Sequence, residues 1–279
     1  MNKEILISII LPCYNDHFYI EEAIDSALNQ TYPKKEVIVV DDGSNAQTKA
    51  VLKKLESRID LLITQGNKGP SAARNNGIKA ARGEYILVLD SDDYFEPEFC
   101  EKAVNLFQKK SEIKVVTSYS RWFVDDTNYK IFKPTGGGLR NYLIKNCAMG
   151  SAIFLKKDWE KIGGYDQNLQ GYEDWEFYIR LHLNGGVTEV LPNILFHYRN
   201  KSKSNNKEAN KNKYKLSKYI YLKHNNLYKE NFELFTNHLL SLIEKEEVEK
   251  TKNTERLDFV LGRNILKPLR FLKHKIFKF

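Results

Sequence analysis

Cysteine is scarce in this 279-residue sequence: three residues, Cys13, Cys100 and Cys147, lie far apart. They show neither metal-type spacing nor an even number at close range, which excludes a disulfide framework or a cysteine-rich zinc site. We therefore expect reduced thiols in a cytosolic protein. Long apolar runs are also lacking, because none approaches the roughly 20 residues of a membrane-spanning helix. The run at 5–11 has no extended basic leader and no small-residue cleavage site, so we interpret it as a buried strand.

Positive charge is not in excess over most of the chain. Residues 1–200 carry 25 Lys and Arg against 27 Asp and Glu, whereas residues 201–279 carry 19 against 9. A basic appendage on a nearly neutral body fits an enzyme better than a nucleic-acid binder, so no nucleic acid is expected as partner. A 42% hydrophobic and 12% aromatic composition favours a folded globule.

Near-continuous apolar runs recur at 5–11, 36–40, 61–64 and 85–89, with helical apolar spacing between them. Strands that are apolar on both faces are typical of a parallel sheet covered by helices. The alternation predicts an α/β fold with a mostly parallel, Rossmann-like sheet. A short polar loop follows each run, and ligands bind at the carboxyl ends of such strands.

Beyond residue 112 the pattern changes to shorter strand-like pieces, a helix-like segment at 171–186 and a strand at 187–199. This predicts a smaller mixed lobe. Lys, Asn and Ser dominate 200–215, after which apolar residues return at helical spacing and predict a helical extension.

The sequence "LDSDD" places Asp90, Asp92 and Asp93 at the end of a predicted strand. Their oxygens suit Mg²⁺ or Mn²⁺, which bind through one or two carboxylates together with ligand phosphates. The alternative is a solvated acidic turn that precedes a helix.

Two further loops have more than one interpretation. In "DDGS", Asp41 and Asp42 either cap the next helix or accept hydrogen bonds from a nucleoside. In "GPSAAR", Gly69 begins a helix whose Arg74 either binds phosphate oxygens or forms an ion pair with an aspartate. Asp174, at the start of an aromatic-rich helix, is a candidate general base.

These motifs occur in one order: "SIILPCYND", "ALNQTYPKKEVIVVDDGS", "NKGPSAARNNGIKAARGEYILVLDSDD", "GGYDQNLQGYEDWEFYIRL" and "HYR". Together, over about residues 5–200, they resemble the family 2 inverting glycosyltransferases, which have the GT-A fold. The resemblance implies a nucleotide-sugar-binding half at 1–112 and an acceptor-binding, catalytic half of the same domain at 113–205. Residues 206–279 would form a basic helical extension.

The resemblance also implies roles for single residues. The nucleotide sugar, UDP-linked by preference, would lie against Pro12, Tyr14, Asn15, Asp41, Asp42, Gly69, Ala72, Arg74, Asp90 and Ser91. Asp92 would be the main ligand of Mn²⁺ or Mg²⁺, with Asp90 beside it, and Asp174 would deprotonate the hydroxyl of a glycan acceptor. Relatives often carry a histidine two residues after "YR", where this chain has Lys201. His197 is therefore a candidate third ligand. The alternatives are that Lys201 and Lys203 neutralise the diphosphate, or that this loop does neither and His197 is an ordinary strand residue.

The basic amphipathic segment at 262–279 suggests attachment to an anionic membrane surface. The alternatives are docking on the body or on a second copy in a homodimer. We expect a cytoplasmic protein that acts in surface polysaccharide synthesis, peripheral on the inner face of the cell membrane if the segment attaches there. The competing functions are a nucleotidyltransferase, which would normally show an early glycine-rich loop, and a nucleic-acid-binding module that uses the basic tail.

Overall fold

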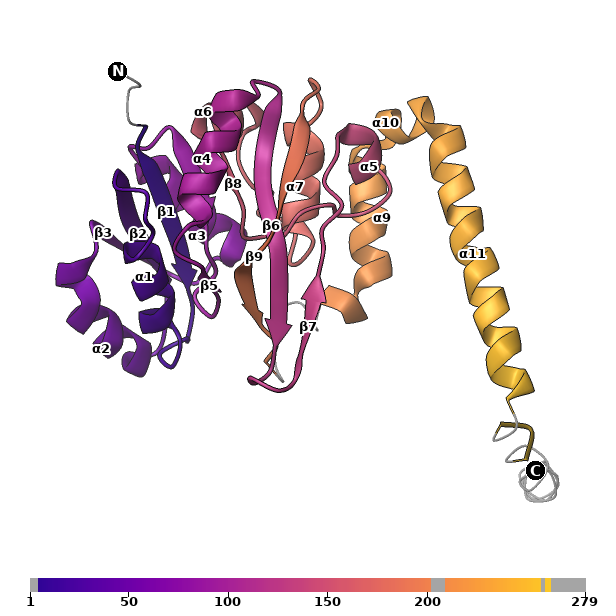
Figure 1. The fold of residues 1–279 in the computed structure, drawn as a ribbon, viewed down its shortest axis with the longest axis horizontal. Coiled ribbons are helices and arrows are strands. Elements are labelled where there is room, and N and C mark those ends of the chain that lie inside the picture. The colour runs from indigo at the N-terminus through magenta and orange to yellow at the C-terminus, as the bar shows by residue number, and fades with distance from the viewer. Residues whose placement is uncertain (1–4, 202–208, 257–258, 262–279) are drawn as a thin grey trace. The chain divides into compact units, whose positions relative to one another are not determined.

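The structure is a computed structural model that describes residues 5–201, 209–256 and 259–261. The chain divides into two compact units, Met1–Asn225 and Asn226–Phe279. One continuous sheet runs through the first unit, so both predicted halves of the fold share it (Figure 1).

The predicted parallel strands are confirmed. In the sheet order β3-β2-β1-β4 they are β3 (Leu61–Gln65), β2 (Lys35–Asp42), β1 (Ile7–Cys13) and β4 (Tyr85–Val88). Each neighbouring pair in this group is parallel, so the four carboxyl ends lie at one edge of the sheet. The connecting helices are α1 (Ile20–Leu28), α2 (Ala46–Leu55), the short 3₁₀ helix η1 (Glu56–Arg58) and α3 (Pro70–Ala80).

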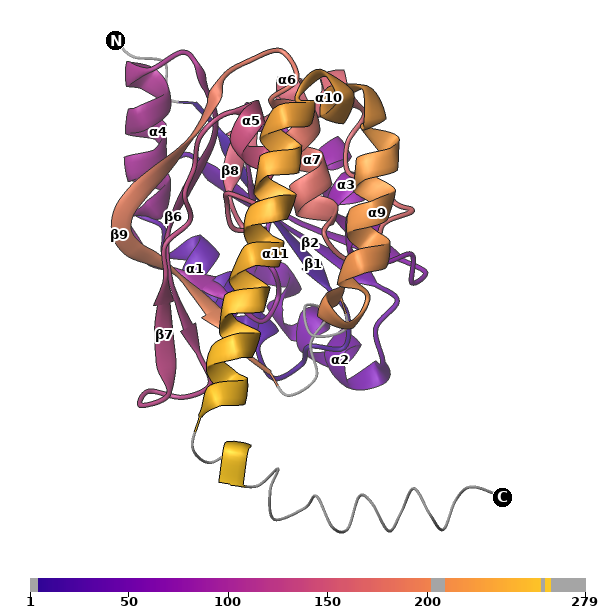
Figure 2. The same ribbon diagram turned by 90° about the vertical axis from the view of Figure 1, so that its right-hand side faces the viewer.

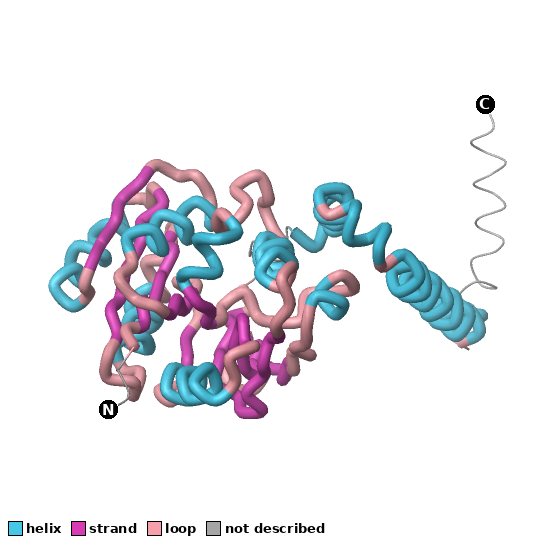
Figure 3. The backbone as a smooth tube through the Cα atoms, turned by 90° about the horizontal axis from the view of Figure 1, so that it is seen from above, coloured by secondary structure: helices cyan, strands magenta, loops and turns pink. Residues whose placement is uncertain are grey.

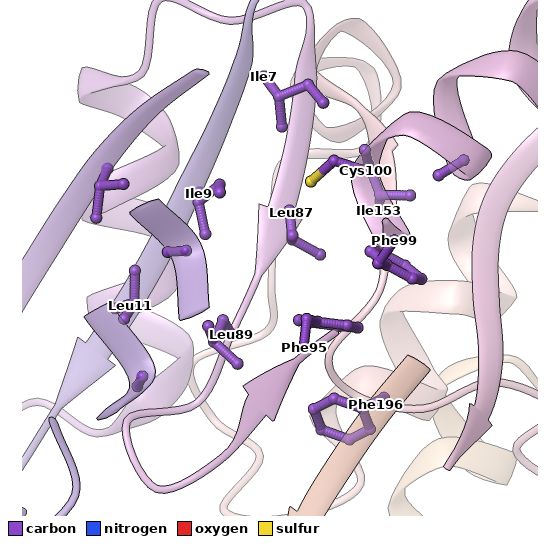
Figure 4. Packing of buried hydrophobic residues seen from close by; sticks show 14 of the residues in the cluster. Ile7, Ile9, Leu11, Leu87, Leu89, Phe95, Phe99, Cys100, Ile153 and Phe196 are labelled. Atoms are coloured by element: carbon purple, nitrogen blue, oxygen red, sulfur yellow. The ribbon is translucent and has the colours of Figure 1, made fainter. Parts of the chain in front are cut away.

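Helices cover both faces of this sheet (Figures 1 and 3). On one face Ile9 and Leu11 join a large buried cluster that includes Phe99 (Figure 4). On the other face α3 lies close against the strands at Gly77, where an added Cβ would come within 2.5 Å of Ile10 Cγ2. Gly77 therefore sets the distance at which α3, the helix that begins in the candidate site, packs on the sheet.

The sheet continues as β8 (Ile153–Leu155), β6 (Ile113–Phe123), β9 (Val187–Arg199) and β5 (Tyr94–Phe95), and β7 (Tyr129–Phe132) pairs with β6. Pairing here is mixed, because β6 runs parallel to β9 and antiparallel to β8. The helices between residues 99 and 181, which accompany these strands in the chain, are α4 (Phe99–Lys109), α5 (Leu139–Tyr142), α6 (Lys156–Ile162) and α7 (Glu173–Leu181). The predicted mixed lobe and its helix near residue 174 are thus present.

The predicted helical extension is also present. Within the first unit, α9 (Lys213–Lys223) lies beside α7 (Figure 2), where Lys223 Nζ is 2.8 Å from Glu176 Oε1. Next come α10 (Asn225–Glu230), at the boundary of the units, and α11 (Phe232–Glu255) in the second unit. No helix in the described ranges is long and apolar enough to cross a membrane. The proposed membrane-binding segment, 262–279, lies outside the described residues.

Candidate active site at the strand carboxyl ends

The loops after β1 and β2 are fastened to each other. Asn15 adopts a left-handed backbone conformation, with φ of 58°. Its backbone N–H donates to Ser44 Oγ at 3.1 Å, and its Oδ1 accepts from the backbone N–H of Asn45 at 2.7 Å. Asp41 Oδ1 accepts from the backbone N–H of Ser44 at 2.8 Å. This arrangement leaves the neighbouring Tyr14 ring 49% exposed at the sheet edge.

Asp42 holds the start of α3. Its carboxylate accepts three hydrogen bonds of 2.8 Å, from Gln65 Nε2 and from the backbone N–H groups of Lys68 and Gly69. Gly43 makes this loop possible, because its φ is 75° and an added Cβ would lie 2.6 Å from the nitrogen of Asn67. Both aspartates of "DDGS" are thus buried and bonded to the protein, and their predicted contact with a nucleotide base stays a prediction.

Arg74, on α3, connects the acidic turn after β4 with the start of helix α7. Its Nη2 lies 2.7 Å from Asp90 Oδ1, just after β4, and its Nη1 lies 2.6 Å from Glu173 Oε1, at the start of α7. The side chain is 6% exposed. Of the two roles considered for Arg74, the ion pair with an aspartate is the one that the structure shows, while a phosphate contact stays a prediction.

The side chains of the acidic turn after β4 bind different partners. Asp93 is buried and accepts from the backbone N–H of Arg199 at 2.8 Å, while Ser91 Oγ donates to Asp16 Oδ2 at 2.7 Å. Asp92 is partly buried, and its Oδ2 lies 2.7 Å from Lys201 Nζ. Burial raises the pKa of Asp92, Lys201 counteracts that shift, and the neighbouring Asp90 and Asp16 add to it. A bound cation would offset the negative charges of Asp90 and Asp16 beside Asp92.

The carboxylates of Asp92 and Asp90 suit a hard divalent cation, because such ions prefer oxygen ligands. Within the described ranges no three His, Cys, Asp or Glu residues are placed to hold a metal ion by themselves. The set predicted from the sequence, Asp92, Asp90 and His197, is therefore not assembled as a cluster. Phosphate oxygens of a bound donor would have to complete the coordination.

His197, the third predicted metal ligand, contacts other side chains, and its role as a ligand stays a prediction. It lies on β9 opposite Tyr94, with the two rings stacked at a centroid distance of 4.3 Å. Its Nε2 is 2.7 Å from Glu96 Oε1. Burial lowers the pKa of His197 against the opposing effect of Glu96. These contacts agree with the alternative considered for His197, an ordinary strand residue.

Asp174 lies in the first turn of α7 and is held by two donors. Its Oδ1 accepts from the backbone N–H of Trp175 at 2.8 Å, and its Oδ2 accepts from Asn146 Nδ2 at 2.8 Å. Burial, helped by the charge of Glu173, raises the pKa of Asp174 to about 6, although both donors and Arg74 act to lower it. A carboxylate with a pKa just below neutrality is both ionised and basic enough to accept a proton from a hydroxyl.

The other predicted residues divide between buried and accessible positions. Pro12, Ala72 and Ser91 are buried, Gly69 is partly exposed, and Asn15 is exposed. Sequence reasoning missed Asp16, Asn146 and Glu173 as parts of the site. Asp16 is the last residue of the segment "SIILPCYND", directly after the predicted site residue Asn15, so its position in the sequence could have indicated it. Asn146 comes from a loop without periodicity, and no sequence signal connects it to Asp174.

Comparison with known proteins finds matching families and relatives. The sequence model of glycosyl transferase family 2 matches residues 8–163, and that of the N-terminal domain of galactosyltransferase matches residues 140–203. A putative teichuronic acid biosynthesis glycosyltransferase, TuaG of Bacillus subtilis, is 31% identical over 213 residues, which is 74% of this chain and 84% of TuaG. Chondroitin synthase of Escherichia coli is 29% identical, over 71% of this chain and 30% of the synthase. An uncharacterized glycosyltransferase of Haemophilus influenzae is 38% identical over 41% of this chain, and the match spans 47% of that relative.

Solved structures share the fold. TarS of S. aureus, in complex with UDP-GlcNAc, superposes with a TM-score of 0.61 at 24% identity, over 71% of this chain and 60% of that chain. The mannosyltransferase PcManGT of Pyrobaculum calidifontis, in complex with GDP-Man and Mn²⁺, gives a TM-score of 0.60 at 16% identity, over 94% of this chain and 84% of that chain. The family model covers more than half of the chain, so this protein belongs to glycosyl transferase family 2 and is a glycosyltransferase with the GT-A fold.

Proposed function

We propose that this protein transfers a sugar from a nucleoside-diphosphate sugar, UDP-linked by preference, to a hydroxyl of a glycan or lipid-linked glycan, with inversion. The observation that carries the proposal is the Arg74 bridge. It ties Asp90, in the acidic turn where the donor would bind, to Glu173, the neighbour of Asp174. Arg74 thus bonds both the acidic turn and Glu173, the sequence neighbour of the base Asp174, whose pKa is raised.

In the proposed reaction the Asp174 carboxylate accepts the proton of the acceptor hydroxyl. The acceptor oxygen forms a bond to the anomeric carbon as the bond from that carbon to the diphosphate oxygen breaks. The nucleoside diphosphate leaves with the bonding electron pair, and a single displacement inverts the anomeric centre. Asn146 and the backbone N–H of Trp175 orient the carboxylate for this proton transfer.

The acidic turn and the loops after β1 and β2 would bind the donor. Asp92, with Asp90, would hold Mn²⁺ or Mg²⁺, which when bound offsets negative charge on the leaving diphosphate. The exposed Tyr14 and the partly exposed Gly69 at the start of α3 are available to the nucleoside and diphosphate. Ala72 is buried, and its contact with the donor stays a prediction. Complexes of TarS with UDP-GlcNAc and of PcManGT with GDP-Man and Mn²⁺ support this assignment.

A role in surface polysaccharide synthesis is supported by the similarity to TuaG and to chondroitin synthase. Cytoplasmic location, attachment to the inner face of the membrane through 262–279 and homodimer formation stay predictions.

Product analysis tests the proposed activity. Nucleotide sugars are first screened with Mn²⁺ by thermal shift, because a ligand that binds only the folded state stabilises it. The selected donor is then incubated with glycan acceptors, with and without EDTA. We expect release of the nucleoside diphosphate and a glycosylated acceptor, both lost with EDTA. Release of pyrophosphate would contradict the proposal and support a nucleotidyltransferase.

A further inference from the structure

Lys201 lies between two carboxylates at the edge of the candidate donor site. Its Nζ is 2.7 Å from Asp92 Oδ2 and 2.8 Å from Asp16 Oδ1. The side chains of Lys201, Asp92 and Asp16 are 23%, 19% and 16% exposed, so this contact is shielded from water far more than an ordinary surface ion pair. Ser91 Oγ holds the second oxygen of Asp16 at 2.7 Å.

The backbone that carries Lys201 is fastened to the same turn. Arg199 donates from its backbone N–H to Asp93 Oδ1 at 2.8 Å and from its Nε to the backbone oxygen of Asp92 at 3.0 Å. Its guanidinium group also lies 4.6 Å from the centroid of the Tyr19 ring. The chain two residues before Lys201 is therefore held against the acidic turn at the end of β9.

Two of the three carboxylates of the acidic turn already have cationic partners. Asp90 is paired with Arg74, and Asp92 is paired with Lys201. Lys201 Nζ lies within 2.8 Å of one oxygen of Asp92 and one of Asp16, which is the geometry of an ammonium group shared by two carboxylates. The ammonium group of Lys201 lies 2.7 Å from Asp92 Oδ2. A divalent ion that binds the same oxygen would be close to this ammonium group, and the two cations would repel each other.

We propose that Lys201 is a tethered counter-cation of Asp92 which a divalent cation must displace in order to bind. The inference rests on the proposed function, since it takes Asp92 as the metal ligand. Metal alone then binds weakly, because it competes with Lys201. A nucleoside diphosphate strengthens metal binding, since its phosphates add ligands for the ion and give the displaced ammonium group a new anionic partner.

Binding of Mn²⁺ alone to the full-length protein, followed by the EPR signal of the free ion, tests this competition. Lys201→Ala is expected to lower the dissociation constant for Mn²⁺ by about tenfold relative to the wild type. Lys201→Arg keeps a cation at this position and is expected to stay close to the wild type. Lys53→Ala is the matched control, because it removes the same charge from an amine that is 81% exposed and paired with Glu56; its Mn²⁺ affinity should not change.

Two further variants make the result decisive. Lys201→Gln keeps most of the side-chain length and repeats the measurement if the alanine variant is less stable. Asp92→Asn combined with Lys201→Ala should abolish the gain in Mn²⁺ affinity, which would locate the ion at Asp92. The proposal is overturned if Lys201→Ala and Lys201→Gln bind Mn²⁺ no more tightly than the wild type, or if the gain survives Asp92→Asn.

This experiment contains no sugar nucleotide, so its outcome is independent of sugar transfer. A protein that transfers sugar but shows no gain in Mn²⁺ affinity would overturn only the role of Lys201. A protein that shows the gain but forms no glycosylated product would overturn only the proposed activity.

Discussion

Arg74 and Glu173, 99 positions apart in the sequence, are joined by a hydrogen-bonded ion pair of 2.6 Å in the interior of the protein. Because Arg74 also holds Asp90, this pair connects the acidic turn after β4 with the helix that carries Asp174. The relative position of the predicted donor site and the predicted base is therefore set by one guanidinium group.

Replacing Arg74 by lysine should destabilise the fold by about 3 kcal/mol, because an ammonium group cannot bond both the buried Glu173 and the partly exposed Asp90 carboxylate as the planar fork does. Urea denaturation measures the change. The control is Arg58→Lys, since the Arg58 side chain is 41% exposed in its pair with Asp25, and a change below about 1 kcal/mol is expected there. Equal effects at the two sites would contradict a structural role for the Arg74 bridge.

Asn146→Ala should move the acid limb of the pH profile of sugar transfer to higher pH. Asn146 donates to the ionised form of Asp174 and so lowers the pKa of that carboxyl group, which is about 6 in the intact protein. Without this donor the pKa rises, and the ionised base is lost at pH values where the wild type still works. The kcat/KM profile measures the limb, and Asn105→Ala, at an exposed position on α4, is the control. A reduced rate with an unmoved limb would show that Asn146 does not tune the base.

Gly43→Ala should weaken donor binding and destabilise the protein by roughly 1–3 kcal/mol, because its φ of 75° is strained for alanine and the new Cβ would lie 2.6 Å from Asn67 N. Gly66→Ala is the matched control in the adjacent loop, since a Cβ there meets no atom within 4 Å. Thermal denaturation and donor titration of both variants compare the two sites. Similar behaviour of the two alanine variants would contradict the close approach of the loops.

Glu176 should make the fold sensitive to acid. Burial acts to raise its pKa, but hydrogen bonds from His224 and Arg180, with the help of Lys223, lower it to about 2. A depressed pKa in the folded state gives stability that is present above the ordinary pKa of 4.5 and is lost as the pH falls from 4.5 towards 2.

The variant Glu176→Gln should therefore lose about 3 kcal/mol at pH 7 and lose less additional stability than the wild type on acidification. Unfolding free energies at pH 7 and pH 3 measure both effects. Glu160→Gln, at a side chain that is 57% exposed, is the control and should follow the wild type. An unchanged difference between the two pH values in Glu176→Gln would contradict this assignment.

The sheet could be predicted from the sequence because its signals are local. The strands β1, β2 and β4 are buried on both faces and read as continuous apolar runs, whereas the edge strand β3 is partly exposed. Pro70 marks the start of α3. The short strands β5 and β7 were not predicted, since two or four residues carry too little pattern.

The residues proposed for the site can be named from the sequence, whereas their side-chain partners cannot. Position at a strand end pointed to Asp92, and the family motif pointed to Asp174. The pairing of Arg74 with Glu173, of Asn146 with Asp174 and of Lys201 with Asp92 depends on how distant segments pack, which no local pattern encodes. The same limit applies to His197, because no local pattern predicts its contact with Glu96. Its role as a metal ligand stays a prediction.

Comparison of Asp174→Asn with the wild type, using titration of the donor with Mn²⁺ and single-turnover transfer to an acceptor, tests the central claim most directly. Asparagine keeps the size of the side chain and cannot accept the proton. The account predicts a donor dissociation constant within about twofold of the wild type and a transfer rate lower by at least about 100-fold. Transfer at the wild-type rate by the Asp174→Asn variant would contradict the assignment of Asp174 as the base.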